Sequence, residues 1–185
     1  MATLRDPTTL PAREAESQLL HVIIETPRGS RGKFRYDEKL GLFRLSKFLP
    51  RGAIFPFDFG FIPSTRAEDG DPLDVLVLME QATFSGCLVT TRLLGVIEAK
   101  QTERGKSVRN DRLIGIPETP KIRPSERSLD DLPAGLLDQV EHFFRSYNEM
   151  EGRTFKPLRR GGVKAAHRLV EEAERRFRSS GSGRG

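Results

Sequence analysis

The acidic segment Asp69-Gly70-Asp71-Pro72-Leu73-Asp74 places three carboxylates within six residues, a pattern that can hold a metal ion. Gly70 allows an unusual turn and Pro72 fixes the next backbone angle, so a bend there can bring the aspartates together. Carboxylates held close repel each other, and a hard cation such as Mg²⁺ or Mn²⁺ relieves that repulsion through oxygen ligands. The competing interpretation is an acidic surface turn, which local composition alone ranks first.

Basic side chains nearer the start of the chain supply the opposite charge. Glu25 ends a predicted strand, and Lys33, Arg35 and Lys47 lie on the hairpin predicted to follow it. A fold that converges these cations opposite the acidic segment would combine carboxylates for metal with cations for phosphate. That is the arrangement phosphoryl transfer requires, so the pattern indicates chemistry on a phosphate compound, although spacing alone does not prove the convergence.

The hydrophobic pattern predicts strands followed by helices as the scaffold for these residues. Short apolar or alternating runs predict strands at residues 19–24, 33–36, 42–45, 73–79, 88–97 and 113–116. The polar stretch 98–109 is predicted to be a loop or a hairpin tip, and helical spacing recurs over 136–147 and 163–177. Strands in the first two thirds and helices in the last third predict an α+β domain, a small antiparallel barrel with helices packed on it.

Length and composition bound the class of protein. The 185 residues suit a single domain, predicted at 19–178 between a flexible arm at 1–18 and a disordered Ser/Gly/Arg-rich tail at 179–185. No apolar run is long enough to span a membrane and no signal peptide is evident, so we expect no membrane contact and a cytoplasmic location. The single Cys87 excludes an internal disulfide and a cysteine zinc site. The net charge of +5 is compatible with phosphate ligands or nucleic acid.

Three motifs together resemble the soluble family I inorganic pyrophosphatases. They are Ile24-Glu25-Thr26-Pro27, the aromatic segment from Phe55 to Ile62, and the segment from Asp69 to Val77 that begins with the three aspartates. The resemblance extends from about Val22 to Tyr147. It implies a five-stranded OB-like antiparallel β-barrel with two C-terminal helices, Mg²⁺-dependent hydrolysis of pyrophosphate to two phosphates, and a homo-oligomer.

The same resemblance implies roles for particular residues. Asp69 and Asp74 would be metal ligands, Asp71 would be the base that helps to activate a metal-bound water, and Glu25 would lie near a further metal. Lys33 would hold phosphate, and Tyr147 would bond to it through its hydroxyl. The remaining cations Arg35, Lys47 and Arg112 are expected to bind the substrate.

Several positions depart from the family pattern, and they cluster at the expected site. Lys47 stands for an arginine, Arg35 for a glutamate, Arg112 and Asn148 for lysines, and Phe55 and Phe59 for tyrosines. Two family aspartates fall on Gln101 and Asn110. Two interpretations stay open: either Glu103 and Asp111, which lie close by, replace the lost carboxylates as metal ligands beside Asn110, or the later metal sites are gone.

Two other classes of function compete with pyrophosphate hydrolysis. The substitutions are compatible with a pseudoenzyme, or a hydrolase of another phosphate compound, on the same scaffold. OB-like barrels with basic surfaces also bind single-stranded nucleic acid, but the acidic segment would repel a phosphate backbone, which makes this partner unlikely. The alternating Phe55, Phe57, Phe59 and Phe61 are predicted to be a buried strand face rather than a base-stacking platform.

Overall fold

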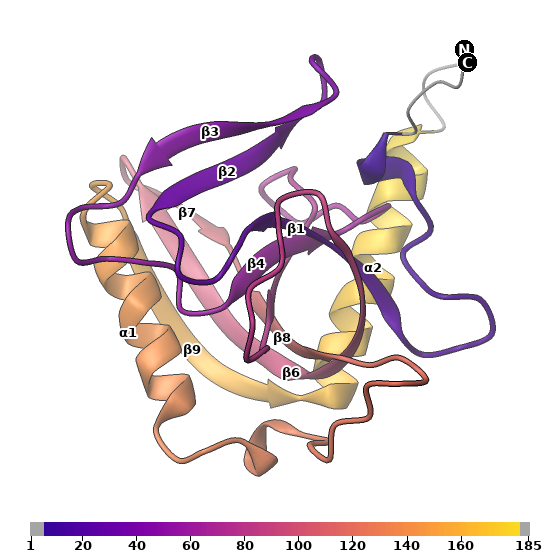
Figure 1. Cartoon of the computed structure of the whole chain (residues 1–185). Helices are drawn as coiled ribbons and strands as arrows, with labels where there is room; N and C mark the ends of the chain where they lie inside the picture. The colour runs from indigo at the N-terminus through magenta and orange to yellow at the C-terminus, as the bar shows by residue number, and fades with distance from the viewer. Residues whose placement is uncertain (1–5, 182–185) are drawn as a thin grey trace.

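Five strands close into a ring in the computed structural model, which describes residues 6–181 (Figure 1). In ring order they are β1 (Leu20–Thr26), β4 (Asp58–Ile62), β5 (Leu73–Val77), β8 (Arg112–Pro117) and β6 (Leu88–Glu103), and β6 pairs back onto β1. Strand β6 is long enough to pair in turn with β1, β8, β9 and β7, so it joins the ring to the outer strands. The α+β class is therefore confirmed.

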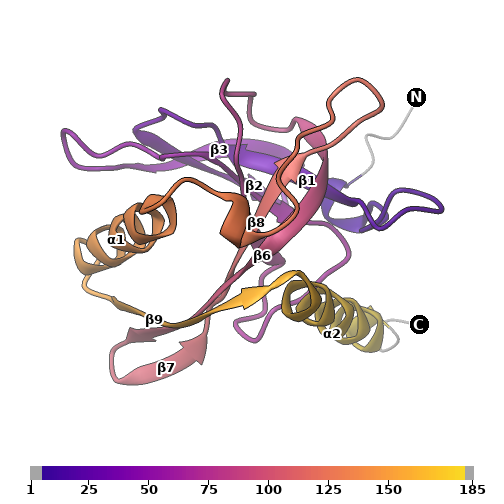
Figure 2. The ribbon, with the colours of Figure 1, turned by 90° about the horizontal axis from the view of Figure 1, so that it is seen from below.

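Further elements surround the ring. Strands β7 (Lys106–Arg109) and β9 (Thr154–Gly162) both pair with β6, and the hairpin of β2 (Gly32–Asp37) and β3 (Leu42–Phe48) forms a separate sheet beside it (Figures 1 and 2). Helices α1 (Leu136–Glu149) and α2 (Val163–Gly181) lie on different sides of the ring. Two short 3-10 turns occupy Pro7–Thr9 and Leu129–Asp131.

Alternation along the strands divides the core into two clusters. In β5, Leu76 packs with the aromatic residues and α1, whereas Val75 and Val77 pack with the apolar face of α2. The first cluster buries aromatic and aliphatic side chains and the second buries aliphatic side chains, and the removal of this apolar surface from water is the main favourable term in folding. Phe55, Phe59 and Phe61 are buried, which confirms the predicted core role of the aromatic series.

Two predictions about the strands are wrong. Strand β9 lies between the two helices, so the last third of the chain is not helical throughout. Its sequence does not alternate in hydrophobicity; it forms because its backbone pairs with β6, and Pro157 sits beside the register shift at Glu98 and Ala99. The predicted antiparallel arrangement is also wrong for one pair of the ring, because β5 and β8 pair in parallel. Strand β8 runs antiparallel to β6, and the β6–β7 hairpin between them supplies the reversal of direction.

The stretch 98–109 is a regular hairpin, which confirms the second of the two predicted alternatives, a hairpin tip. Strand β6 continues to Glu103, turns at Arg104 and Gly105, and returns as β7. Both turn residues have positive φ angles, 47° and 78°, which the glycine accommodates without strain. This hairpin pairs Gln101 with Val108 and brings the side chains of Gln101 and Asn110 within hydrogen-bond distance, so it builds one side of the site described below.

The two ends of the chain differ from the predicted arm and tail. Thr8 and Ala12 are buried, and Arg13 Nη2 lies 3.2 Å from Glu174 Oε2 on α2, so the first part of the segment 6–18 contacts the domain. Helix α2 continues to Gly181 through the start of the predicted tail. Residues 1–5 and 182–185 lie outside the described residues. In the described part of the chain, no helix is long and apolar enough to cross a membrane.

Candidate active site

A pocket at one end of the ring, named here the site pocket, collects most of the residues singled out from the sequence. The predicted residues that line it are Glu25, Lys33, Arg35, Asp69, Asp71, Asp74, Asn110, Arg112 and Tyr147. They come from β1, the β2–β3 hairpin, the turn before β5, β8 and α1. The pocket has four cationic and five carboxylate side chains, so it can receive an anionic compound together with a metal ion.

The acidic turn, residues 69–74, bends at Gly70 as the sequence predicts. Gly70 has a φ of 94°, and a Cβ there would meet open space, so the positive φ angle is what favours glycine. The Asp71 amide donates to Asp69 Oδ1 at 3.2 Å, and the Asp71 carbonyl accepts from Ala67 N at 2.7 Å. These bonds hold the turn, and the exposed Asp71 side chain lines the site pocket with no hydrogen bond or ion pair to residues 6–181.

Burial and mutual repulsion raise the pKa values of Glu25, Asp69 and Asp74. Burial is the largest cause that raises the pKa of Glu25 to about 7, although the Tyr36 amide, which donates to Glu25 Oε1 at 2.8 Å, opposes the shift. Burial also raises the pKa values of Asp69 and Asp74, and the charges of the neighbouring aspartates add to it. A bound cation would reverse this penalty, because it favours the ionised form.

Another part of the pocket lining, named here the amide wall, adjoins the acidic turn and consists of Gln101, Asn110 and Arg112. Asn110 Nδ2 donates to Gln101 Oε1 at 2.9 Å, and Arg112 Nη1 donates to Asn110 Oδ1. The same Arg112 nitrogen lies 2.5 Å from Asp74 Oδ2. A continuous hydrogen-bonded chain therefore runs from the amide wall to the acidic turn.

The third side of the pocket is cationic and aromatic. Lys33 Nζ lies 5.7 Å from the ring centroid of Phe59 and 5.4 Å from that of Tyr147. Lys47 does not line the pocket; its Nζ lies behind Tyr147, 4.9 Å from the ring centroid, and 2.6 Å from Glu151 Oε2. Burial lowers the pKa of Lys47, but hydrogen bonds to Glu151 and Tyr147 outweigh it and raise the pKa overall.

Two predicted metal ligands, Glu103 and Asp111, lie outside the site pocket. Glu103 is exposed at the hairpin and its Oε2 lies 3.0 Å from Arg153 Nε. Asp111 Oδ1 accepts from the Ala99 amide at 2.9 Å and from Arg109 Nε at 3.0 Å. Asp111 points away because neighbouring residues of an extended strand face opposite sides, so Asn110 faces the pocket instead.

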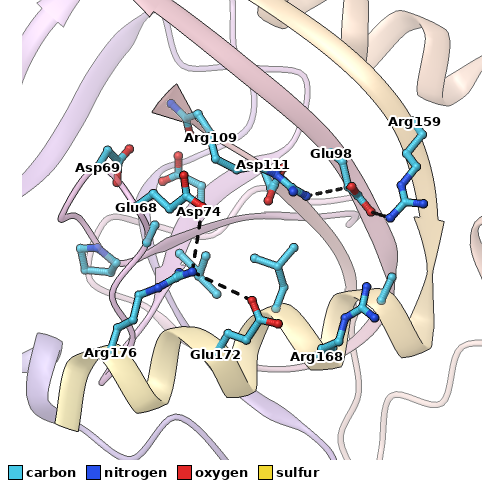
Figure 3. Close-up of a pocket in the computed structure, with 16 residues that line it drawn as sticks. Glu68, Asp69, Asp74, Glu98, Arg109, Asp111, Arg159, Arg168, Glu172 and Arg176 are labelled. Carbon is cyan, nitrogen blue, oxygen red and sulfur yellow. Dashed lines mark hydrogen bonds and ion pairs between the residues drawn. The ribbon is translucent and has the colours of Figure 1, made fainter. Parts of the chain in front are cut away.

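Figure 3 shows a second pocket, named here the rear pocket, which is lined by Asp111 and by residues of β6, β9 and α2. Asp69, Asp74 and Asn110 line both pockets, so they form the partition between them. Most charges in the rear pocket pair with one another: Glu98 contacts Arg109 at 2.8 Å and Arg159 at 2.9 Å. These pairs support the far side of the partition.

The structure adds pocket residues that the sequence analysis did not assign to the site. They are Thr8, Tyr36, Glu38, Phe59, Phe61, Pro72, Gln101, Asn148 and Arg153. Gln101 was noted only as a departure from a family pattern. Arg153 follows α1 and reaches the pocket because β9 pairs with β6, and no local motif marks it. In the sequence, the positive charge of Arg153 is the only signal that could have predicted it as a pocket residue.

The donor atoms of the acidic side fit a hard divalent cation. They are carboxylate oxygens whose pKa values are raised by burial and mutual repulsion, which are the conditions a cation relieves. Within residues 6–181, however, no three His, Cys, Asp or Glu side chains are grouped tightly enough to surround an ion. The set therefore suits Mg²⁺, which commonly takes one or two carboxylates and completes its shell with water and phosphate oxygens.

Comparison with known proteins gives one consistent result. A family model described as inorganic pyrophosphatase matches residues 22–178. The inorganic pyrophosphatase of Synechocystis sp. is 35% identical over 173 residues, which cover 94% of this chain and 99% of that protein. The Thermus thermophilus inorganic pyrophosphatase is 34% identical over 172 residues, covering 93% and 94% of the two chains.

Solved structures agree with the sequence relatives. The crystal structure of inorganic pyrophosphatase from Thermus thermophilus has a TM-score of 0.85 at 33% identity and covers 94% of this chain and 99% of its own. That of an inorganic pyrophosphatase from Neisseria gonorrhoeae has a TM-score of 0.81 at 30% identity and covers 91% and 96%. The similarity extends over nearly the whole chain and confirms the predicted OB-like fold class.

Proposed function

The chain belongs to the inorganic pyrophosphatase family and hydrolyses pyrophosphate to two phosphates, and we propose that this reaction takes place in the site pocket with Mg²⁺ as the cofactor. The observation that carries the proposal is the opposition, in one pocket, of the acidic turn to the cations Lys33, Arg35 and Arg112. Pyrophosphate needs both, because it is strongly anionic and its hydrolysis places further charge on oxygen.

Glu25, Asp69, Asp71 and Asp74 are the carboxylates proposed to hold metal, with one or two of them bound to an ion and water and phosphate oxygens completing its shell. Their carboxylates are hard oxygen donors, and their cost of ionisation falls when a cation is present. When bound, Mg²⁺ would offset phosphate charge and lower the pKa of the attacking water. Manganese suits the same donors and would serve as a substitute.

Asp71 is proposed as the general base. It is exposed toward the pocket, its backbone is held by the turn, and its carboxylate accepts no hydrogen bond from residues 6–181. A base needs this access, because it must come within hydrogen-bond reach of the proton that it accepts.

The cationic residues would bind and orient the two phosphate groups. Lys33 and Arg35 lie on β2, above the acidic turn, whereas Arg112 lies on β8 opposite them. The Tyr147 hydroxyl is proposed as a further phosphate ligand at the end of α1. Lys47 is proposed to act at a distance, through its contact with Tyr147 and its positive charge.

The test is phosphate release by purified protein from pyrophosphate, triphosphate, nucleotides and sugar phosphates, each with Mg²⁺ or Mn²⁺. We expect pyrophosphate with Mg²⁺ to give the highest kcat/KM. Higher turnover of another phosphate compound would reassign the substrate, as the cation-rich pocket permits. Absence of turnover by folded protein, while the Thermus thermophilus relative is active in the same assay, would contradict the proposal.

A homo-oligomer and a cytoplasmic location remain predictions of the sequence analysis. Light scattering coupled to size-exclusion chromatography would measure the molar mass, which we expect to be a multiple of the 20.8 kDa chain. A mass equal to one chain would contradict this expectation.

A further inference from the structure

The amide wall offers hydrogen-bond donors where the acidic turn offers acceptors. The oxygens of both amides are engaged inside the wall: Gln101 Oε1 accepts from Asn110, and Asn110 Oδ1 accepts from Arg112. By contrast, Gln101 Nε2 and the buried Arg112 Nε have no hydrogen-bond partner among residues 6–181. The wall thus keeps an unused N–H donor at Gln101 Nε2, which suits an anion, whereas each amide oxygen already accepts one hydrogen bond and has one lone pair left.

Arg112 is fixed in place by packing and not only by its ion pair. Its residue is 5% exposed, and its guanidinium carbon lies 4.9 Å from the ring centroid of Phe144, 5.6 Å from that of Phe155 and 5.9 Å from that of Phe59. Arginine stacks on aromatic faces and stays charged at all ordinary pH values. The amide wall therefore carries a permanent positive charge beside Asp74.

We propose that Arg112 and the Gln101–Asn110 pair take the place of a divalent cation on this side of the site pocket, so that phosphate oxygens of the substrate contact the wall directly. A divalent cation at this position would have to bind neutral amide oxygens that already accept hydrogen bonds. It would also lie beside the positive charge of Arg112, which repels it. This inference rests on the proposed function, because it assigns one end of the diphosphate to protein donors and the other end to metal held by the acidic turn.

The first experiment counts metal ions without any substrate. Equilibrium dialysis of metal-free protein against Mn²⁺ compares the wild type with the double variant Gln101→Asp/Asn110→Asp. The variant should bind one additional Mn²⁺ per chain, because two carboxylates beside Asp74 outweigh the charge of Arg112. The matched control Gln81→Glu/Gln139→Glu adds the same charge at exposed positions outside the pocket and should bind as many ions as the wild type.

The second experiment measures anion binding without metal. Methylenediphosphonate, a diphosphate that cannot be hydrolysed, is titrated calorimetrically into the same proteins in EDTA. Wild type and control should bind it, and the double variant should bind at least about tenfold more weakly, since carboxylates replace the donors. The two readouts move in opposite directions, which a general loss of structure would not produce.

Milder variants guard against misfolding of the double variant. Asn110→Asp alone keeps the acceptor for Arg112, and we expect about a tenfold gain in Mn²⁺ affinity from its added charge. Equal Mn²⁺ number and affinity in the wild type and both acidic variants, with folding confirmed by circular dichroism, would overturn the proposal. An inactive wild type that shows the expected dialysis result would instead contradict the proposed function alone.

Discussion

The acidic turn and the amide wall line one pocket and touch at the ion pair of Asp74 with Arg112, but they manage charge in opposite ways. The turn contains Asp69 and Asp74, whose pKa values are raised by burial, so a positive charge from outside the turn is needed to stabilise their ionised forms. In the wall, Asn110 and Arg112 satisfy one another and Asp74 through direct hydrogen bonds. This difference indicates that the acidic turn suits a cation and that the amide wall suits an anion.

The largest effect is expected where the turn acts on the substrate. Asp71→Asn should lower kcat about a thousandfold, because the amide cannot accept the proton. The free energy of unfolding should hardly change, since the Asp71 side chain is exposed. Stopped-flow or steady-state phosphate release gives kcat, and urea denaturation gives stability. Asp130→Asn, at an exposed position outside the pocket, is the control; a similar loss in both variants would remove Asp71 from the catalytic role.

The second-largest effect is expected on the free energy of unfolding, when the positive charge of Arg112 is removed from the amide wall. Arg112→Met leaves Asp74 without its ion-pair partner and removes the contacts with three aromatic rings. We expect the free energy of unfolding to fall by about 3 kcal/mol in metal-free protein. Arg123→Met, at an exposed position, should change it by less than about 0.5 kcal/mol. An Arg112 variant as stable as wild type would show that the ion pair is not a structural part of the wall.

On the acidic side of the pocket, we expect the free energy of unfolding to depend on pH. Glu25 has a pKa of about 7 in the fold against an ordinary value of 4.5, so the folded state binds its proton more tightly. Stability contributed by the neutral form is therefore lost as pH rises from about 4.5 through 7. In EDTA, Glu25→Gln should remove this fall and be about 1–2 kcal/mol more stable than wild type at pH 8.

Urea denaturation at pH 5 and pH 8 would measure that difference. Glu38→Gln is the matched control, since it makes the same substitution at an exposed glutamate of the same pocket. Identical pH dependence in wild type and the Glu25 variant would mean that Glu25 ionises as freely as an exposed carboxylate.

The smallest effect is expected at Lys47, which lies behind the pocket. Lys47→Ala should raise KM about threefold with little change in kcat, because it removes a cation that acts through Tyr147 and from a distance. Its ion pair with Glu151 is partly exposed, so stability should fall by less than about 1 kcal/mol. A loss of kcat comparable with that of Asp71→Asn would place Lys47 in direct contact with the reacting phosphate.

Part of this site could be read from the chain. The turn at Gly70, the strand that follows it and the two helices carry local signals: a positive-φ glycine, alternation and helical spacing. Strand β9 carries no such signal, because its pairing with β6 supplies what its own pattern lacks. For the same reason Arg153, which the strand brings to the pocket, was not predicted.

The sequence by itself determined the acidic turn, the α+β class and the family, because each depends on residue types at short spacing. Only the tertiary structure decided which neighbours face the pocket. In the extended chain near 110, alternation of side chains turns Asp111 to the rear pocket and leaves Asn110 beside Gln101 and Arg112. Whether a carboxylate or an amide meets the substrate thus depended on strand register, which is set by pairing between distant segments.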